Sequence, residues 1–114
     1  MAVALTLTYA GVTPRGYDRL MESFDFDASP PIGQILHAAS EGANGMEAFE
    51  VWQTSDAAER FVEAVLAPRV AELGGELLYE IRPLHNLFAP DLDTIERIGG
   101  VSLPGVAAGA VLRR

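Results

Sequence analysis

Residues 50–61, Glu50-Val51-Trp52-Gln53-Thr54-Ser55-Asp56-Ala57-Ala58-Glu59-Arg60-Phe61, mark a change from strand to helix. The strand ends near Trp52, and Ser55 is expected to cap the helix because its hydroxyl can accept a bond from a first-turn N–H. An apolar stripe at helical spacing follows, formed by Ala58, Phe61, Val62 and Val65. The junction therefore predicts a strand that leads directly into a helix packed on the same sheet.

The elements on either side follow from similar patterns. Residues 2–9 (AVALTLTY) alternate, which predicts a strand rather than a signal peptide. Thr13 and Pro14 are typical of a helix start and predict a helix over 14–24. Strands are expected at 33–40, 46–53 and about 76–87, with a hairpin turn at 41–45 around Asn44-Gly45. A helix from Ser55 should kink or end near Pro68.

This βαββαβ order predicts an α+β, ferredoxin-like fold, with a four-stranded antiparallel sheet and both helices on one face. Apolar residues occur at both parities of the strands, as in Leu77 and Leu78. An antiparallel sheet with one wet face should alternate more cleanly, so we expect a second copy of the chain to cover the other face. Residues 1–88 should form this domain, and 89–114 an extension with a short helix at 91–98.

Composition excludes several classes of function. The net charge is −8, and all eight basic residues are arginine. This balance argues against binding nucleic acid or an anionic membrane surface, because both require clustered cations. The chain has no cysteine, which removes thiolate chemistry and disulfides. No apolar run approaches the ~20 residues that span a bilayer, and a cytoplasmic location is expected.

Two segments carry a resemblance to a known family. They are the junction at 50–61, with its W-x-[ST]-x-x-A-x-x-F pattern, and the closing segment Ile81-Arg82-Pro83-Leu84-His85-Asn86-Leu87-Phe88. Over residues 2–88 the chain resembles small antibiotic-biosynthesis-monooxygenase-like proteins of the dimeric α/β-barrel superfamily, including actinobacterial members of unknown function. The resemblance implies a homodimer and a cofactor-free monooxygenase-like activity on an apolar aromatic or polyketide-like substrate. A non-catalytic dimer that binds a ligand or serves assembly is the alternative, because a fold does not fix a function.

The candidate site residues are few. His85 is the candidate general base, since imidazole titrates near neutrality. The expected substrate-binding residues are Trp52, His37, Tyr79, Tyr17 and Asn86. The alternative interpretation is structural: both histidines would bond to backbone, and Trp52 would fill the core.

No metal site is expected. In the predicted strand order the two histidines lie about 14 Å apart within one subunit, too far to share an ion. The strand glutamates Glu47, Glu50 and Glu80 are expected to be solvated, although one on a buried face would be a candidate for a shifted pKa.

Overall fold

The computed structural model describes residues 1–26 and 28–90 of the 114-residue chain. Four strands and four helical segments follow the predicted order: β1 (Val3–Ala10), α1 (Pro14–Phe24), β2 (Gln34–Gly42), β3 (Gly45–Trp52), α2 (Ser55–Phe61), a π-helical turn (Val62–Leu66), α3 (Ala67–Glu72) and β4 (Glu76–Pro83). The sheet has the order β2-β3-β1-β4, and each neighbouring pair is antiparallel. The predicted α+β, ferredoxin-like architecture is therefore confirmed.

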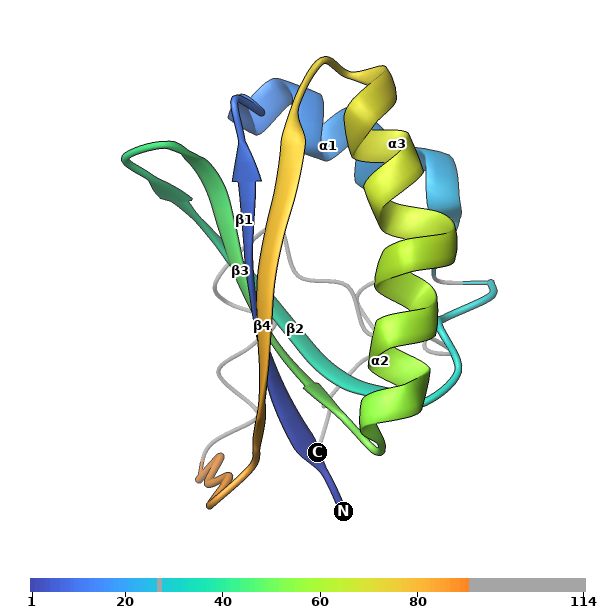
Figure 1. Cartoon of the computed structure of the whole chain (residues 1–114), viewed down its shortest axis with the longest axis vertical. Coiled ribbons are helices and arrows are strands. Elements are labelled where there is room, and N and C mark those ends of the chain that lie inside the picture. Colours follow the sequence, from blue (N-terminus) through green and yellow to red (C-terminus); the bar gives the residue numbers. More distant parts are fainter. Residues whose placement is uncertain (27, 91–114) are drawn as a thin grey trace, which may run out of the picture.

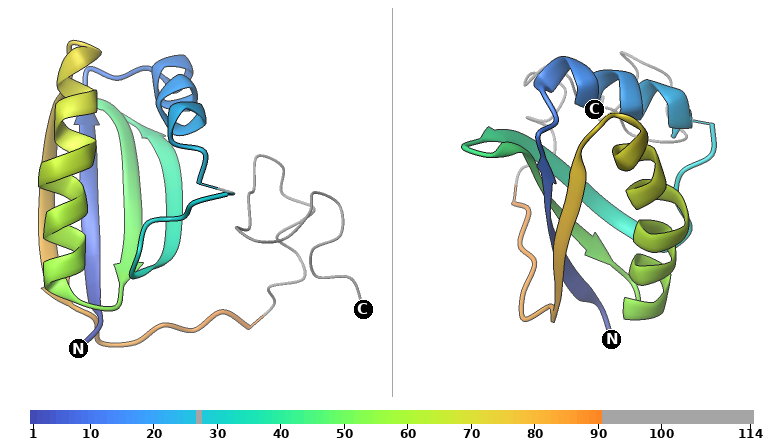
Figure 2. Two further views of the ribbon diagram at one scale, coloured as in Figure 1. Left: turned by 90° about the vertical axis from the view of Figure 1, so that its right-hand side faces the viewer. Right: turned by 45° about the horizontal axis from the view of Figure 1, so that its top comes forward.

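The helix α1 and the helix formed by α2, the π-helical turn and α3 lie on the same side of the sheet (Figures 1 and 2). Alternation in β1 produces this arrangement, because every second side chain points toward the helices. Val3, Leu5, Leu7 and Tyr9 are all buried on this side. They pack in one core with Leu20 of α1 and with three residues of the second helix: Val62 and Leu66 of the π-helical turn, and Val70 of α3. The core thus occupies the space between the sheet and the helices.

The helix starts follow capping rules, with one correction. Thr13 caps α1 as predicted, and its hydroxyl accepts a bond from the Gly16 N–H at 3.0 Å. The cap of α2 is Thr54 rather than the predicted Ser55. Thr54 has an extended backbone that aims its hydroxyl at the Ala57 N–H, 3.1 Å away, whereas Ser55 is already the first helical residue. A cap must precede the first helical residue, which is the reason for the correction.

The helix does not break at Pro68. Instead a π-helical turn at Val62–Leu66 precedes it, and Pro68 occupies the first turn of α3. Proline has no N–H and its ring crowds the preceding turn, so a wider turn accommodates it without ending the helix.

The last strand is shorter than predicted. It ends at Pro83, which lies opposite Val3, the first residue of β1. Because β1 offers no further strand residue to pair with, the chain leaves the sheet after a final bond from the Leu84 N–H to the Ala2 carbonyl (3.0 Å). His85 and Asn86 therefore follow the strand rather than belonging to it.

The hairpin between β2 and β3 also shifts slightly. Its turn is formed by Ala43 and Asn44, between the paired residues Gly42 and Gly45, one position earlier than Asn44-Gly45. Gly45 has a φ of +136°, and a Cβ there would stand 2.2 Å from the Tyr9 carbonyl oxygen. Only glycine fits this close approach between β3 and β1.

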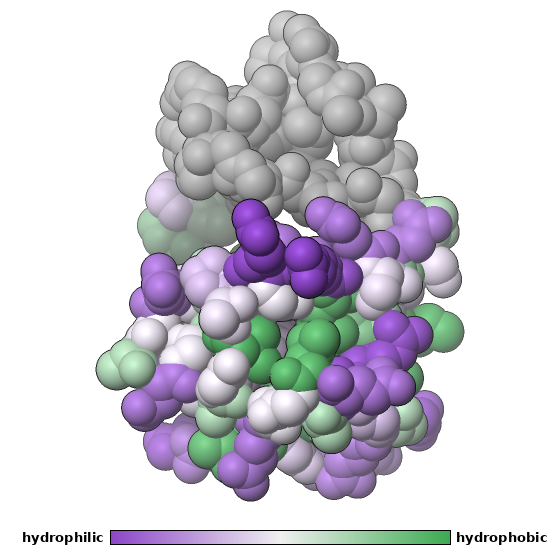
Figure 3. All heavy atoms as spheres, turned by 90° about the horizontal axis from the view of Figure 1, so that it is seen from above, coloured by the Kyte–Doolittle hydropathy of each residue, from purple (hydrophilic) through white to green (hydrophobic). Residues whose placement is uncertain are grey.

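The surface carries apolar and hydrophilic residues side by side. Viewed from above, small apolar areas are interspersed among hydrophilic ones (Figure 3). Within residues 1–26 and 28–90, no helix has both the length and the apolar character needed to cross a bilayer. The predicted extension from Ala89, including its helix at 91–98, lies outside the described residues except for Ala89 and Pro90.

Candidate functional site

A buried carboxylate stands at the centre of the helix-covered side of the sheet. Glu50 lies on β3 with the same parity as Trp52, and its exposed fraction is 1%. The Trp52 indole Nε1–H donates to Glu50 Oε1 at 2.7 Å, and His37 Nδ1 lies 2.5 Å from Glu50 Oε2. His37 is placed there by the hairpin register, since it is the residue of β2 directly opposite Glu50. Each carboxylate oxygen thus has a partner, which a buried charge requires.

Helix α1 supplies the next member of the chain of hydrogen bonds. The Tyr17 hydroxyl bonds to His37 Nε2, and the two rings lie nearly parallel, with centroids 6.1 Å apart and 9° between their planes. The His37 side chain is 24% exposed, against 2% for that of Glu50. We call Tyr17, His37, Glu50 and Trp52 the Glu50 network. It connects a partly exposed edge of the sheet with the core.

A second tyrosine packs beside this network. Tyr9 of β1 is fully buried, and its ring meets Tyr17 edge-on with centroids 5.5 Å apart. Among the described residues, the Tyr9 hydroxyl has no hydrogen-bond partner. An unpaired buried hydroxyl costs about 1–3 kcal/mol relative to a paired one, so this atom calls for an explanation.

The electrostatics keep both phenols protonated. Burial, followed by the negative charge of Glu50, raises the pKa of Tyr9 and of Tyr17 well above the usual range of tyrosine. Both side chains therefore present O–H groups at neutral pH.

The hydrogen-bond pattern assigns the protons of the network. The Glu50 carboxylate accepts at both oxygens, so His37 carries its proton on Nδ1 and offers the Nε2 lone pair to the Tyr17 hydroxyl. A histidine oriented by a carboxylate in this way can accept a proton at Nε2 while the carboxylate stabilises the resulting imidazolium. Within the two described ranges, no group of three or more histidine or acidic side chains could hold a metal ion.

This architecture was compared with those of known proteins. No family model matches the sequence, and no curated protein shows a significant sequence match. Solved structures do match. SnoaB, a cofactor-independent oxygenase from Streptomyces nogalater, is 12% identical with a TM-score of 0.51, and the match covers 75% of this chain and 93% of that one.

A single-residue variant of SnoaB matches at 13% identity and a TM-score of 0.52, over 75% of this chain and 94% of that one. A Chloroflexus aurantiacus protein described as a putative antibiotic biosynthesis monooxygenase is 14% identical with a TM-score of 0.50, and the match covers 78% of this chain and 98% of that one. The chain has the antibiotic-biosynthesis-monooxygenase-like fold.

Within this fold, three of the predicted site residues come together. Trp52, His37 and Tyr17 are all members of the Glu50 network. Tyr79 lies elsewhere: it is 38% exposed on β4, and its hydroxyl donates to Glu63 Oε2 at 2.8 Å. His85 and Asn86 are exposed on the segment after β4. The roles predicted for these six residues, His85 as the general base and the other five in substrate binding, stay predictions.

The central residue of the network escaped the sequence analysis. Glu50 was expected to be solvated, but it is buried. Two signals could have found it: its parity matches that of Trp52, and a turn at 43–44 sets it opposite His37. Arg82 takes no part in this network and forms an exposed ion pair with Glu80, at 2.9 Å.

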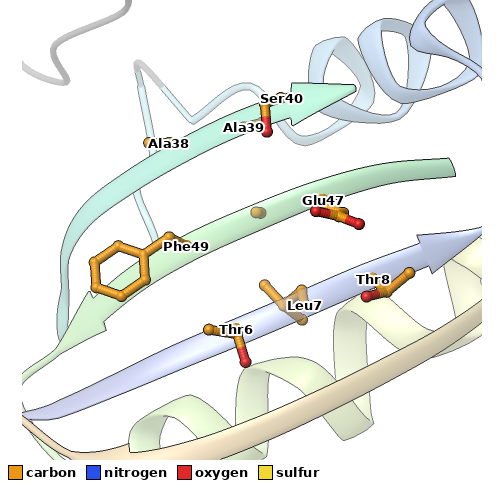
Figure 4. Close-up of a pocket in the computed structure, with 9 residues that line it drawn as sticks. Thr6, Leu7, Thr8, Ala38, Ala39, Ser40, Glu47 and Phe49 are labelled. Carbon is orange, nitrogen blue, oxygen red and sulfur yellow. The ribbon is translucent and has the colours of Figure 1, made fainter. Parts of the chain in front are cut away.

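The helix-free face of the sheet has a different character. An open groove of about 420 Å³ lies across three of the four strands, lined by Thr6, Leu7 and Thr8 of β1, Ala38, Ala39 and Ser40 of β2, and Glu47, Ala48 and Phe49 of β3. In Figure 4 the sheet is seen from the side opposite the helices, and Phe49, Thr6 and Thr8 lie on this face. Phe49 is 41% and Leu78 51% exposed there. The groove and the Glu50 network thus lie on opposite sides of the sheet.

Proposed function

We propose that this protein binds an aromatic, polyketide-like molecule and oxygenates it without a cofactor, with His37 as the general base. The observation that carries the proposal is the bond between His37 Nδ1 and the buried Glu50 carboxylate. This bond leaves Nε2 as the proton acceptor at the partly exposed end of the network, where a substrate would take the place of the Tyr17 hydroxyl. A base held in this orientation is what proton abstraction from a weakly acidic carbon or hydroxyl requires.

The reaction balances without an added reductant. His37 removes a proton from a CH2 group that is conjugated with a ring carbonyl through the aromatic rings, and the substrate carbanion gives electrons to O2. Loss of the second hydrogen and cleavage of the O–O bond leave one oxygen atom on carbon as C=O and release the other as water. The net change is CH2 + O2 → C=O + H2O, so the substrate carbon supplies all four electrons. Glu50 stabilises the imidazolium form of His37 during the transfer.

The substrate class is supported by the side chains around Trp52. Its indole packs against Phe61 with centroids 5.5 Å apart, and Phe61 in turn contacts Phe24 and Phe26 at 6.2 and 6.1 Å. Phe24 and Phe26 are themselves stacked at 4.9 Å. Aromatic rings favour offset or edge contacts with other flat rings, so this cluster suits a planar apolar ligand better than an aliphatic one.

We further propose that a second copy of the chain covers the helix-free face. Phe49 and Leu78 are exposed there beside an open groove, although the face also carries Thr6, Thr8 and Glu47. Sheet-to-sheet association through a two-fold axis would bury both apolar side chains. The dimer is thus a proposal that is independent of the chemistry of the Glu50 network.

A non-catalytic role is the second candidate, and one observation favours it. Both oxygens of Glu50 and both nitrogens of His37 already have partners within the chain. In this alternative the network has a structural role alone: it joins β2, β3 and α1. The protein would then be a ligand-binding or assembly module.

The test uses an anthrone as the substrate under air, with oxygen uptake and quinone absorbance as readouts. We expect His37→Asn to lower turnover at least about 100-fold, the usual contribution of a general base. Glu50→Gln should lower it as well, whereas Glu72→Gln, an exposed carboxylate on α3, serves as the control. Turnover that survives in His37→Asn but not in His85→Ala would transfer the role to His85. Anthrone binding without oxygen uptake by the wild type would favour the non-catalytic module.

A further inference from the structure

Both nitrogens of His37 have partners within the chain, so the proposed base is blocked in the arrangement described above. Nδ1 bonds to Glu50, and Nε2 bonds to the hydroxyl of Tyr17. The His37 side chain is 24% exposed, yet neither nitrogen is free to meet a ligand. Access to Nε2 therefore requires Tyr17 to leave, and Tyr17 belongs to α1.

Helix α1 is held to the sheet by fewer buried side chains than the second helix. Of the 11 residues of α1 only Leu20 is buried, whereas the second helix buries Ala58, Val62, Leu66 and Val70. Apolar burial stabilises a structure roughly in proportion to the area removed from water. We therefore expect α1 to separate from the sheet at a lower cost in free energy than the second helix, as a local opening of the fold.

The polar contacts of α1 give Tyr17 a particular place. Across residues 1–26 and 28–90, its bond to His37 is the only side-chain hydrogen bond from α1 to the sheet. The other external bond of α1 reaches α3, where Arg69 donates to the Ser23 hydroxyl at 2.9 Å on the exposed surface. The Tyr17 hydroxyl is thus the polar contact that fixes α1 on the sheet.

We propose that α1 is a gate over His37, which the Tyr17 hydroxyl holds closed. The gate turns about the residues that flank the helix, Thr13 at its start and Asp25 at its end, where φ is +53°. Hinged motions use a few residues at the ends of elements in this way. The open state exposes Nε2 and takes Leu20 out of the core. This inference rests on the proposed function, to which it adds the control of access to the base.

The first measurement is the rate at which diethyl pyrocarbonate, a reagent for neutral imidazole, modifies each histidine without any ligand. The chain has two histidines, and the exposed His85 is the internal reference. We expect His37 to react about 10- to 1,000-fold more slowly than His85, since minor states are commonly populated at about 0.1–10%. Tyr17→Phe removes only the hydroxyl and should raise the His37 rate about fivefold, the effect of one hydrogen bond.

Tyr79→Phe is the matched control for this measurement. The Tyr79 hydroxyl also joins a strand to a helix, since it donates to Glu63 at 2.8 Å. It lies on β4, at the opposite edge of the sheet from the strand that carries His37. Its loss should therefore leave the modification rate of His37 unchanged.

The second measurement separates a moving helix from a tyrosine side chain that turns alone. The chain has no cysteine, so Leu20→Cys places a single thiol on the buried side of α1, and Leu66→Cys places one in the second helix. A thiol reagent should label Leu20→Cys at least about tenfold faster than Leu66→Cys, because only the first becomes accessible by a local opening. Adding Tyr17→Phe should raise the labelling rate of Leu20→Cys alone.

Three outcomes would overturn the gate. They are equal labelling of the two thiols, a His37 rate that Tyr17→Phe leaves unchanged, and faster modification of His37 without faster labelling of Leu20→Cys. The last result would assign access to a rotation of the Tyr17 side chain. Neither measurement uses a substrate, so an absence of anthrone turnover would reject the oxygenase proposal and leave the gate intact.

Discussion

The two faces of this sheet are built from alternate residues of the same strands, yet they differ in how their polar groups are treated. On the helix-covered side, Glu50 is buried and each of its oxygens is bonded. On the helix-free side, Glu47 and Thr6 stand beside exposed Phe49, around an open groove. The comparison teaches that polarity alone does not identify a site; a polar group that is both buried and paired does.

The largest test of this difference is Glu50→Ala. It leaves the His37 and Trp52 donors without their common acceptor inside the protein, and we expect a loss of ~3 kcal/mol in unfolding free energy. Urea denaturation followed by circular dichroism would measure it. Glu72→Ala, on the exposed surface of α3, should stay within about 0.5 kcal/mol of the wild type. A similar small change for Glu50→Ala would mean that the burial of Glu50 has been misjudged.

Trp52→Phe removes one bond of the network together with part of the indole's volume. The smaller phenyl ring leaves some of the buried space unfilled, and Glu50 Oε1 loses the indole N–H at 2.7 Å. We expect a loss of ~2 kcal/mol, because a buried carboxylate oxygen is left unpaired. Phe61→Leu, which touches the same indole without removing a hydrogen bond, should cost less than about 1.5 kcal/mol. Equal losses in the two variants would assign the effect to packing.

The pH dependence tests the burial of Tyr9. Its pKa is raised in the folded protein, so the stability it contributes is fully present below the unfolded pKa of about 10 and is lost as the pH rises above it. Unfolding free energy should then fall by up to ~1.4 kcal/mol per pH unit for this phenol. Tyr9→Phe should show a correspondingly shallower slope between about pH 10 and 11.5 in urea titrations. An unchanged slope would show that Tyr9 ionises equally in both states.

The smallest effect on folding is expected on the opposite face. Phe49→Asp changes a side chain that is 41% exposed, so the free energy of unfolding of one subunit should change by less than about 1 kcal/mol. The proposed dimer should nevertheless dissociate, because two facing carboxylates would replace an apolar contact. Light scattering after size-exclusion chromatography would show half the molar mass, whereas Phe49→Leu should keep the dimer. A wild-type monomer at micromolar concentration would remove the dimer proposal.

Local patterns were sufficient to predict the fold. Alternation in residues 3–9 identified β1 and its core face, and the Thr13-Pro14 pair located the start of α1 within the sequence. The end of β4 could not be read in this way, since it depends on where β1 begins to pair. Strand length is a property of two segments, and the sequence of one of them is not enough.

The candidate site was predictable only in part for a related reason. His37, Trp52 and Tyr17 have residue types that invite a functional interpretation, whereas a strand glutamate does not. The role of Glu50 depends on its register with β2, where a shift of the turn by one residue changes its neighbour. The Tyr9 hydroxyl is unpaired because no neighbouring element places a hydrogen-bond partner beside it, and no sequence motif predicts this.

The π-helical turn at Val62–Leu66 keeps the buried side chains of its helix pointing in the same direction, toward the sheet. Val62, Leu66 and Val70 are all buried although they recur every four residues, a spacing that drifts around an ordinary α-helix by about 40° per step. The wider turn rotates the chain less per residue and so offsets the drift. Losing a single residue from this turn would rotate Val70 by about 100° away from the sheet. The number of residues in this stretch is therefore constrained as tightly as their identity.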